Sequence, residues 1–151
     1  MRIVVAAMLA ALCGLPAQAQ VVAEPEVVAS FLEAYGLKVE RDIDDLGDPM
    51  LSSRIEGSYF DVFFYGCTEA KDCDSIEFSA EFELEQEGLL ELMNAWNREG
   101  RYGRAYVDES GVANIEYDVN LDFEGVGGKN FDDTIDVWRA VLADFRKHID
   151  W

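Results

Sequence analysis

The chain has 151 residues, of which 12 are basic and 31 acidic, and its formal net charge at pH 7 is −19. An acidic field of this size repels nucleic-acid phosphates and anionic lipid surfaces, so the composition argues against partners of either kind. The same field attracts cations and basic proteins, although solubility is the commoner reason for an acidic surface.

The first 19 residues have the pattern of an export signal. Arg2 supplies a positive charge, an apolar run of 15 residues extends from Ile3 to Ala17, and Ala17-Gln18-Ala19 resembles a cleavage site. A membrane-spanning helix needs roughly 20 apolar residues, so a retained anchor is the weaker alternative. We predict cleavage after Ala19, no membrane insertion afterwards, and a protein that is periplasmic in a Gram-negative host and otherwise secreted. Cleavage leaves 11 basic and 31 acidic residues, a net charge of −20.

The remaining chain predicts a short tail at residues 20–24 and a single α+β domain at residues 25–151. No internal repeat or long linker divides it. Pro25 is a favourable first helical residue and Gly36 a favourable stop, which predicts the first helix. In chain order we then expect strands near 38–43, 51–56, 59–65 and 75–84, a helix near 87–98, strands near 102–107 and 112–123, and a last helix from Asn130.

Two of these strands alternate strictly between apolar and polar residues. In 75–84 the apolar row is Ile76, Phe78, Ala80, Phe82 and Leu84, and 112–123 repeats the pattern from Ile115 to Phe123. One buried and one wet face on each strand favours an antiparallel sheet, of about five to six strands. Helices are expected to pack on its buried face.

The last helix has the clearest helical periodicity. Asp133 is placed to complete a cap at Asn130. Its apolar stripe is Phe131, Ile135, Trp138, Leu142, Phe145 and Ile149.

Cys67 and Cys73 lie where one predicted strand ends and the next begins. The ends of a hairpin come close enough for a disulfide, and export favours one. The alternative is a redox pair, but catalytic pairs usually have two intervening residues rather than five.

Four aspartates gather around the turn that follows the first strand: Asp42, Asp44, Asp45 and Asp48. They are a weak calcium candidate, because Leu46 and Ser53 stand where an EF-hand loop requires ligands. A solvated acidic turn is the preferred interpretation, and the sequence predicts no cofactor. His148 is the only histidine, which excludes zinc sites built on two or more histidines.

A glycine-rich stretch, Gly125 to Asn130, precedes the last helix. It fails as a phosphate loop, because Phe123 replaces the first glycine and Asn130 the serine or threonine. We interpret it as a flexible turn before a capped helix.

The candidate binding residues are charged. Acidic rows on two strands form one acidic face if those strands are neighbours; the alternative is a wet face that keeps the protein soluble. A carboxylate-based hydrolase is a further alternative, although paired carboxylates are unspecific evidence for one. The main basic group either neutralises nearby carboxylates or holds an acidic group of a partner. The candidates are Glu77, Glu81, Glu83, Asp118 and Asp122, with Arg98, Arg101 and Arg104.

Three stretches carry a family resemblance: Tyr59 to Cys67, Asn94-Ala95-Trp96-Asn97, and Arg101 to Asp108. Together with the strand order they resemble the YbjN-domain family of bacterial sensory transduction regulators, whose fold is similar to type III secretion chaperones. Either Asn94 or Asn97 is expected to cap the helix or bond to the next strand. The chain departs from cytoplasmic members in its export signal and cysteine pair.

The resemblance implies a non-enzymatic, chaperone-like or adaptor-like module that binds a protein partner with a basic or extended segment. A calcium-responsive envelope protein is the alternative, besides the hydrolase. Tyr59, Phe63 and Tyr65 are the expected anchors if the first helix does not cover them.

Overall fold

The computed structural model describes residues 20–151, and the predicted signal at residues 1–19 lies outside that range. A six-stranded antiparallel sheet has the strand order β2-β3-β4-β5-β7-β6, and a second sheet pairs β1 with β8. The predicted α+β class and antiparallel sheet are confirmed. The elements are β1 Gln20–Val21, α1 Pro25–Tyr35, β2 Glu40–Ile43, β3 Pro49–Ile55, β4 Ser58–Tyr65, β5 Ser75–Phe82, α2 Leu89–Glu99, β6 Arg104–Val107, β7 Ala113–Asn120, β8 Val126–Gly127 and α3 Gly128–His148.

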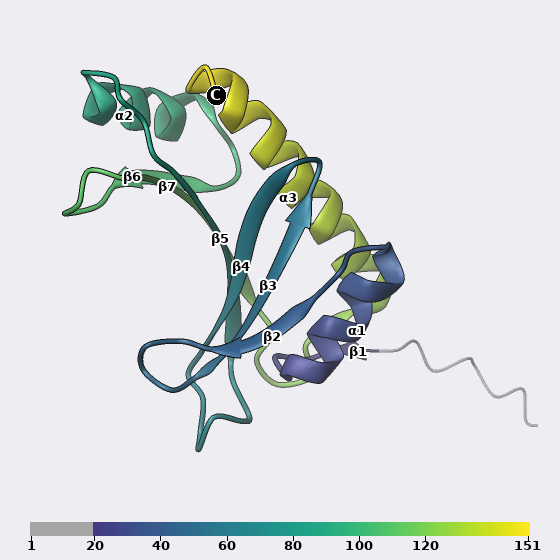
Figure 1. The fold of residues 1–151 in the computed structure, drawn as a ribbon. Coiled ribbons are helices and arrows are strands. Elements are labelled where there is room, and N and C mark those ends of the chain that lie inside the picture. The colour runs from purple at the N-terminus through teal and green to yellow at the C-terminus, as the bar shows by residue number, and fades with distance from the viewer. Residues whose placement is uncertain (1–19) are drawn as a thin grey trace, which may run out of the picture.

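The three helices of residues 20–151 leave one face of the sheet uncovered. Figure 1 shows α3 along one side of the curved sheet, with α1 beside its N-terminal half. Helix α2 packs against the edge strand β6 and meets α3 through Trp96 and Phe145, whose rings are 5.1 Å apart. We call the side that α3 covers the inner face of the sheet, and the other the outer face.

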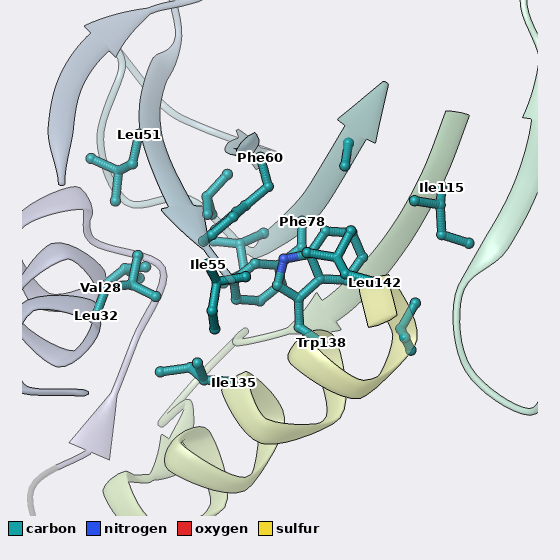
Figure 2. Packing of buried hydrophobic residues seen from close by; sticks show 14 of the residues in the cluster. Val28, Leu32, Leu51, Ile55, Phe60, Phe78, Ile115, Ile135, Trp138 and Leu142 are labelled. Carbon is teal, nitrogen blue, oxygen red and sulfur yellow. The ribbon is translucent and has the colours of Figure 1, made fainter. Parts of the chain in front are cut away.

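The core lies between α3 and the inner face. Every residue of the predicted α3 stripe is buried. Figure 2 shows Trp138 among side chains of the sheet, and its ring centroid lies 5.6 Å from that of Phe78 and 6.0 Å from that of Phe60. Burial of aromatic side chains of this size supplies most of the driving force that fixes α3 on the sheet.

The segment predicted as a tail is instead part of the fold. Val21 and Ala23 are buried, and β1 pairs with β8. Gly125 makes this pairing possible, because a Cβ atom there would overlap the Val21 carbonyl. The predicted flexible turn at residues 125–130 is therefore wrong in part: it includes a paired strand.

The start of α3 also differs from the prediction. The helix begins at Gly128 rather than Asn130, and no side chain caps it. The preceding strand β8 already fixes the direction of the chain, so the helix does not depend on an Asp133 cap.

The C-terminal end of β7 comes earlier than predicted. The strand stops at Asn120, and Asn120 Oδ1 accepts a hydrogen bond from the Asp122 N–H at 2.9 Å. Phe123 then lies in the following turn with a φ of 59° and is 93% exposed. Its assignment to the buried row of the strand is wrong.

The predicted disulfide between Cys67 and Cys73 is present in the structure. It closes the loop between β4 and β5. The backbones of Cys73 and Ala23 pair in an isolated antiparallel β-bridge. The Asp72 N–H donates to Glu24 Oε1 at 3.3 Å. The disulfide loop therefore contacts the N-terminal segment of the described chain.

Candidate functional site

The outer face contains buried polar side chains. Glu77 is 4% exposed and Glu116 is 7% exposed, and Ser79 and Asn114 beside them are also buried. The predicted wet face is therefore wrong for these positions. Long side chains of the neighbouring strands lie over the two glutamates, which the alternation of a single strand does not reveal.

Arg104 holds three carboxylates of the outer face. Its Nη2 atom lies 2.5 Å from Glu77 Oε2 and 2.6 Å from Glu116 Oε2, and its Nε atom lies 3.6 Å from Asp118 Oδ2. The strand register produces this arrangement, because Glu77 pairs with Asp118 across β5 and β7, and Arg104 with Glu116 across β6 and β7. Charge-assisted hydrogen bonds of this kind are about twice as strong as neutral ones.

Two tyrosines complete the arrangement. The Tyr65 hydroxyl donates to Glu77 Oε1 at 3.0 Å, and the Tyr106 hydroxyl donates to Glu116 Oε1 at 2.6 Å. Burial and the nearby carboxylates raise the pKa of both tyrosines, so both remain protonated donors. We call this group the Arg104 cluster: Tyr65, Glu77, Arg104, Tyr106, Glu116 and Asp118.

The carboxyl group of Glu77 is shifted toward its neutral form. Burial raises its pKa, and the Glu116 carboxylate raises it further, while Arg104 and the Tyr65 hydroxyl oppose the shift. Arg104 is largely exposed, since 59% of its side chain is accessible against 5% for Glu77. The cluster thus presents a guanidinium to solvent and holds its two glutamates beneath it.

The structure separates the other predicted basic residues from this cluster. Arg98 pairs with Glu99 at 2.9 Å on α2. Arg101 lies over the ring of Tyr102, with 5.6 Å between the guanidinium carbon and the ring centroid. Only Arg104 of the three reaches the acidic rows.

The predicted acidic rows are only partly brought together. Glu77 and Asp118 face each other across β5 and β7. Glu81 is exposed on β5, whereas Glu83 and Asp122 lie beyond the ends of their strands. Glu116 and Tyr106 are not among the predicted binding residues, although their alternation with inward residues is visible in the sequence.

A small hollow lies beside the Arg104 cluster on the outer face. Its volume is about 180 Å³. We call it the Tyr59 hollow, and its lining residues are Tyr59, Phe60, Asp61, Phe63, Ser79, Ala80 and Glu81. Tyr59 is 74% exposed and Tyr65 is 43% exposed, so the first helix does not cover these anchors.

Asn97 positions the edge strand next to the cluster. Its amide nitrogen donates to the Ala105 carbonyl at 2.8 Å, and its amide oxygen accepts from the Ala105 N–H at 2.8 Å. The expectation that one of the two asparagines bonds to the following strand is confirmed for Asn97. The side chain satisfies the outward backbone groups of β6 at this position.

The acidic turn uses its carboxylates to order its own backbone. Asp44 Oδ1 accepts from the N–H groups of Leu46 and Asp48, each at 2.9 Å. Across residues 20–151, no group of three or more histidine, cysteine, aspartate or glutamate side chains is placed to hold a metal ion. No helix within the same range has the length and apolar character needed to span a membrane.

His148 lies at the boundary of the core. Its Nε2 atom is 2.8 Å from the Leu92 carbonyl oxygen, and its ring contacts that of Trp96. It joins α3 to α2. Neither of these two contacts involves a residue of the Arg104 cluster.

The protein is a small α+β domain built on a curved antiparallel sheet. Helices cover the inner face of the sheet, and its uncovered outer face is charged and aromatic. The family model of YbjN, described as "Putative bacterial sensory transduction regulator", matches residues 24–151. The chain belongs to the YbjN family. No curated protein matches the chain.

Proposed function

We propose that this protein is an exported, non-enzymatic module that binds a protein partner through the outer face of its sheet and so acts as a regulator or adaptor. The observation that carries the proposal is the uncovered outer face, where exposed aromatic side chains adjoin a fixed charged cluster. Tyr59, Tyr65 and Tyr106 supply large, rigid contact areas, and residues of this type dominate binding energies at protein interfaces.

The Arg104 cluster prepares this face for binding. Each of its glutamates is bonded to both Arg104 and a tyrosine, so these side chains lose little conformational freedom when a partner arrives. Pre-organised surfaces bind more tightly for the same contact area. The same bonds disfavour the hydrolase hypothesis, because the glutamates are engaged with their neighbours.

The edge strand β2 offers a second element of recognition. All four of its residues are exposed, whereas Asn97 occupies the edge of β6 at Ala105. An extended partner segment can add to β2 by backbone pairing and continue toward the aromatic residues of the outer face. This mode agrees with the chaperone-like activity that the family resemblance implies.

The acidic charge favours partners with basic segments. The net charge of the chain is −19, which speeds the encounter with a basic protein and makes the complex sensitive to salt. The disulfide fits an oxidising compartment outside the cytoplasm, which supports the export proposal. An intact mass beginning at Gln20 for the extracytoplasmic protein is the expected result, and a full-length mass would contradict export.

Capture from an extracytoplasmic extract tests the binding proposal. The baits are the oxidised protein, a Tyr59→Ala/Tyr65→Ala variant, and a Leu90→Ala control that removes an exposed apolar side chain from α2. We expect a discrete protein at about 0.05 M NaCl with the first and third baits, and its release at about 0.5 M NaCl. Equal capture by all three baits, or no discrete capture, would contradict the proposed surface.

A further inference from the structure

We propose that the Tyr59 hollow is a subsite for one lysine or arginine side chain of the bound partner. The inference rests on the proposed function and assigns a ligand chemistry to one position of its surface. A hollow of about 180 Å³ suits a single long side chain, because drug-sized ligands occupy about 300–1,000 Å³.

The hollow combines two carboxylates with aromatic walls. Asp61 stands opposite Ser79 across β4 and β5, and Glu81 follows Ser79 by two residues on the same face of β5. The rings of Tyr59 and Phe63 line the same hollow. Carboxylates bind a cationic head group by charge-assisted hydrogen bonds, while aromatic rings accept both the alkyl stem and the cation.

The carboxylates of the hollow have no basic partner of their own. Among residues 20–151, neither Asp61 nor Glu81 forms an ion pair within 4.0 Å. The Ser52 hydroxyl donates to Asp61 Oδ1 at 2.6 Å and thereby fixes that carboxylate. This absence of a basic partner next to apolar walls distinguishes the hollow from the Arg104 cluster, whose carboxylates share one guanidinium.

Two further side chains point to a cation. The guanidinium carbon of Arg54 lies 4.9 Å from the centroid of the Tyr59 ring, so one face of this ring already accepts a positive group from within the protein. Ser79 is only 8% exposed and lines the hollow, and its hydroxyl forms no side-chain hydrogen bond with another residue of the described chain. It supplies a hydroxyl oxygen to the head group of an entering lysine or arginine.

A titration with defined peptides tests the subsite. The probe is a short peptide of alternating lysine and threonine, and the matched probe contains acetyl-lysine, which removes the charge but retains the alkyl stem. Binding to the oxidised protein is followed by amide chemical shifts in NMR spectra at low salt. We expect the largest shifts at Phe63, Ser79 and Glu81, and at least a tenfold weaker Kd for the acetylated probe.

Two exposed positions allow substitutions that keep the fold. Glu81→Gln is expected to raise the Kd of the lysine probe about fivefold, through loss of a charge-assisted contact. Tyr59→Leu retains an apolar side chain but removes the ring, and it is expected to raise the Kd about threefold. The control Asp132→Asn changes the net charge equally on α3, which packs on the opposite face, and should alter the Kd less than about twofold.

The outcomes separate this inference from the proposed function. Shifts at the hollow, with Kd changes confined to Glu81→Gln and Tyr59→Leu, support the subsite. Equal Kd values for these variants and Asp132→Asn would overturn it, as would equal binding of both probes. In either of these cases, capture of a partner that depends on Tyr59 and Tyr65 would leave the binding function standing without a cation subsite.

Discussion

A single arginine compensates the negative charge of two buried carboxylates. Glu77 and Glu116 are almost completely removed from water, and Arg104 is the only cation in the described chain that contacts either of them. A buried ion pair is weak evidence for net stability, but removal of one partner is costly, because the remaining charge is left uncompensated. Removal of one partner by mutation therefore tells more about the stability contributed by the cluster than the number of its ion pairs does.

We predict that Arg104→Met lowers the free energy of unfolding by about 3 kcal/mol at pH 7, because both glutamates lose their countercharge. Urea unfolding of the oxidised protein measures the change. Arg98→Met is the matched control: its ion pair with Glu99 is exposed, so its loss should cost less than about 1 kcal/mol. Similar values for both variants would show that Arg104 does not compensate the buried charges.

The raised pKa of Glu77 predicts a pH dependence. The folded state binds the Glu77 proton more tightly than the unfolded state, whose carboxyl has a pKa near the ordinary 4.5. Between the two pKa values the folded state holds more protons, so the stability contributed by Glu77 falls as pH rises through that window. Below the unfolded pKa the contribution is fully present.

We predict that Glu77→Gln removes this dependence. The neutral amide resembles the protonated carboxyl, so wild type and variant should agree most closely near pH 4, and wild type should lose stability relative to the variant as pH rises. Urea unfolding at several pH values gives the difference, in which the titrations of groups outside the Arg104 cluster cancel. A difference that does not change with pH would refute the assignment.

At the scale of the element, the edge strand β6 shows how a side chain replaces a missing strand. Asn97 provides one donor and one acceptor to the backbone of Ala105, as a neighbouring strand would. Unprotected edges invite association with other chains, so the contact stabilises β6 and also limits pairing there. On the opposite edge, the Ile43 N–H of β2 donates to the Asp42 carboxylate at 2.9 Å, but within residues 20–151 no side chain of another element bonds to the β2 backbone as Asn97 does to β6.

We predict that Asn97→Ala lowers the free energy of unfolding by about 1–2 kcal/mol, because the buried N–H and C=O groups of Ala105 lose their partners. The control Asn94→Ala alters an exposed asparagine of the same helix and should stay within about 0.5 kcal/mol. Chemical unfolding measures both, and light scattering reports association through the freed edge. Equal stability of the two variants would mean that water replaces the Asn97 amide at no cost.

The sequence predicted those elements whose periodicity is local. The α3 stripe and the apolar row of β5 as far as Phe82 were correct, because each depends on one helix or strand facing one core, whereas Leu84 of the predicted row lies beyond the end of the strand. The burial of Glu77 and Glu116 was not predictable in this way, since it depends on Arg104 and two tyrosines brought from other strands. The early end of β7 and the pairing of β1 with β8 likewise depend on contacts between distant parts of the chain.

At the scale of the whole molecule, one property acts in opposite directions on folding and binding. The chain carries 31 acidic residues against 12 basic ones, and like charges repel more strongly in the compact state than in the unfolded chain. Salt screens this repulsion over about 8 Å at 0.15 M ionic strength. The same screening weakens attraction to a basic partner.

We therefore predict that NaCl raises the melting temperature of the protein while it weakens capture of the partner. Most of the thermal gain should occur below about 0.3 M NaCl, because electrostatic screening changes most steeply there, and a shallower slope should follow. Thermal unfolding followed by circular dichroism across a salt series measures the first effect. The lysine probe, titrated across the same series, measures the second. A melting temperature that falls over the low-salt range would contradict this prediction. It would mean that favourable ion pairs such as those of Arg104 stabilise the folded state more than the net repulsion destabilises it, so that the acidic charges are compensated locally.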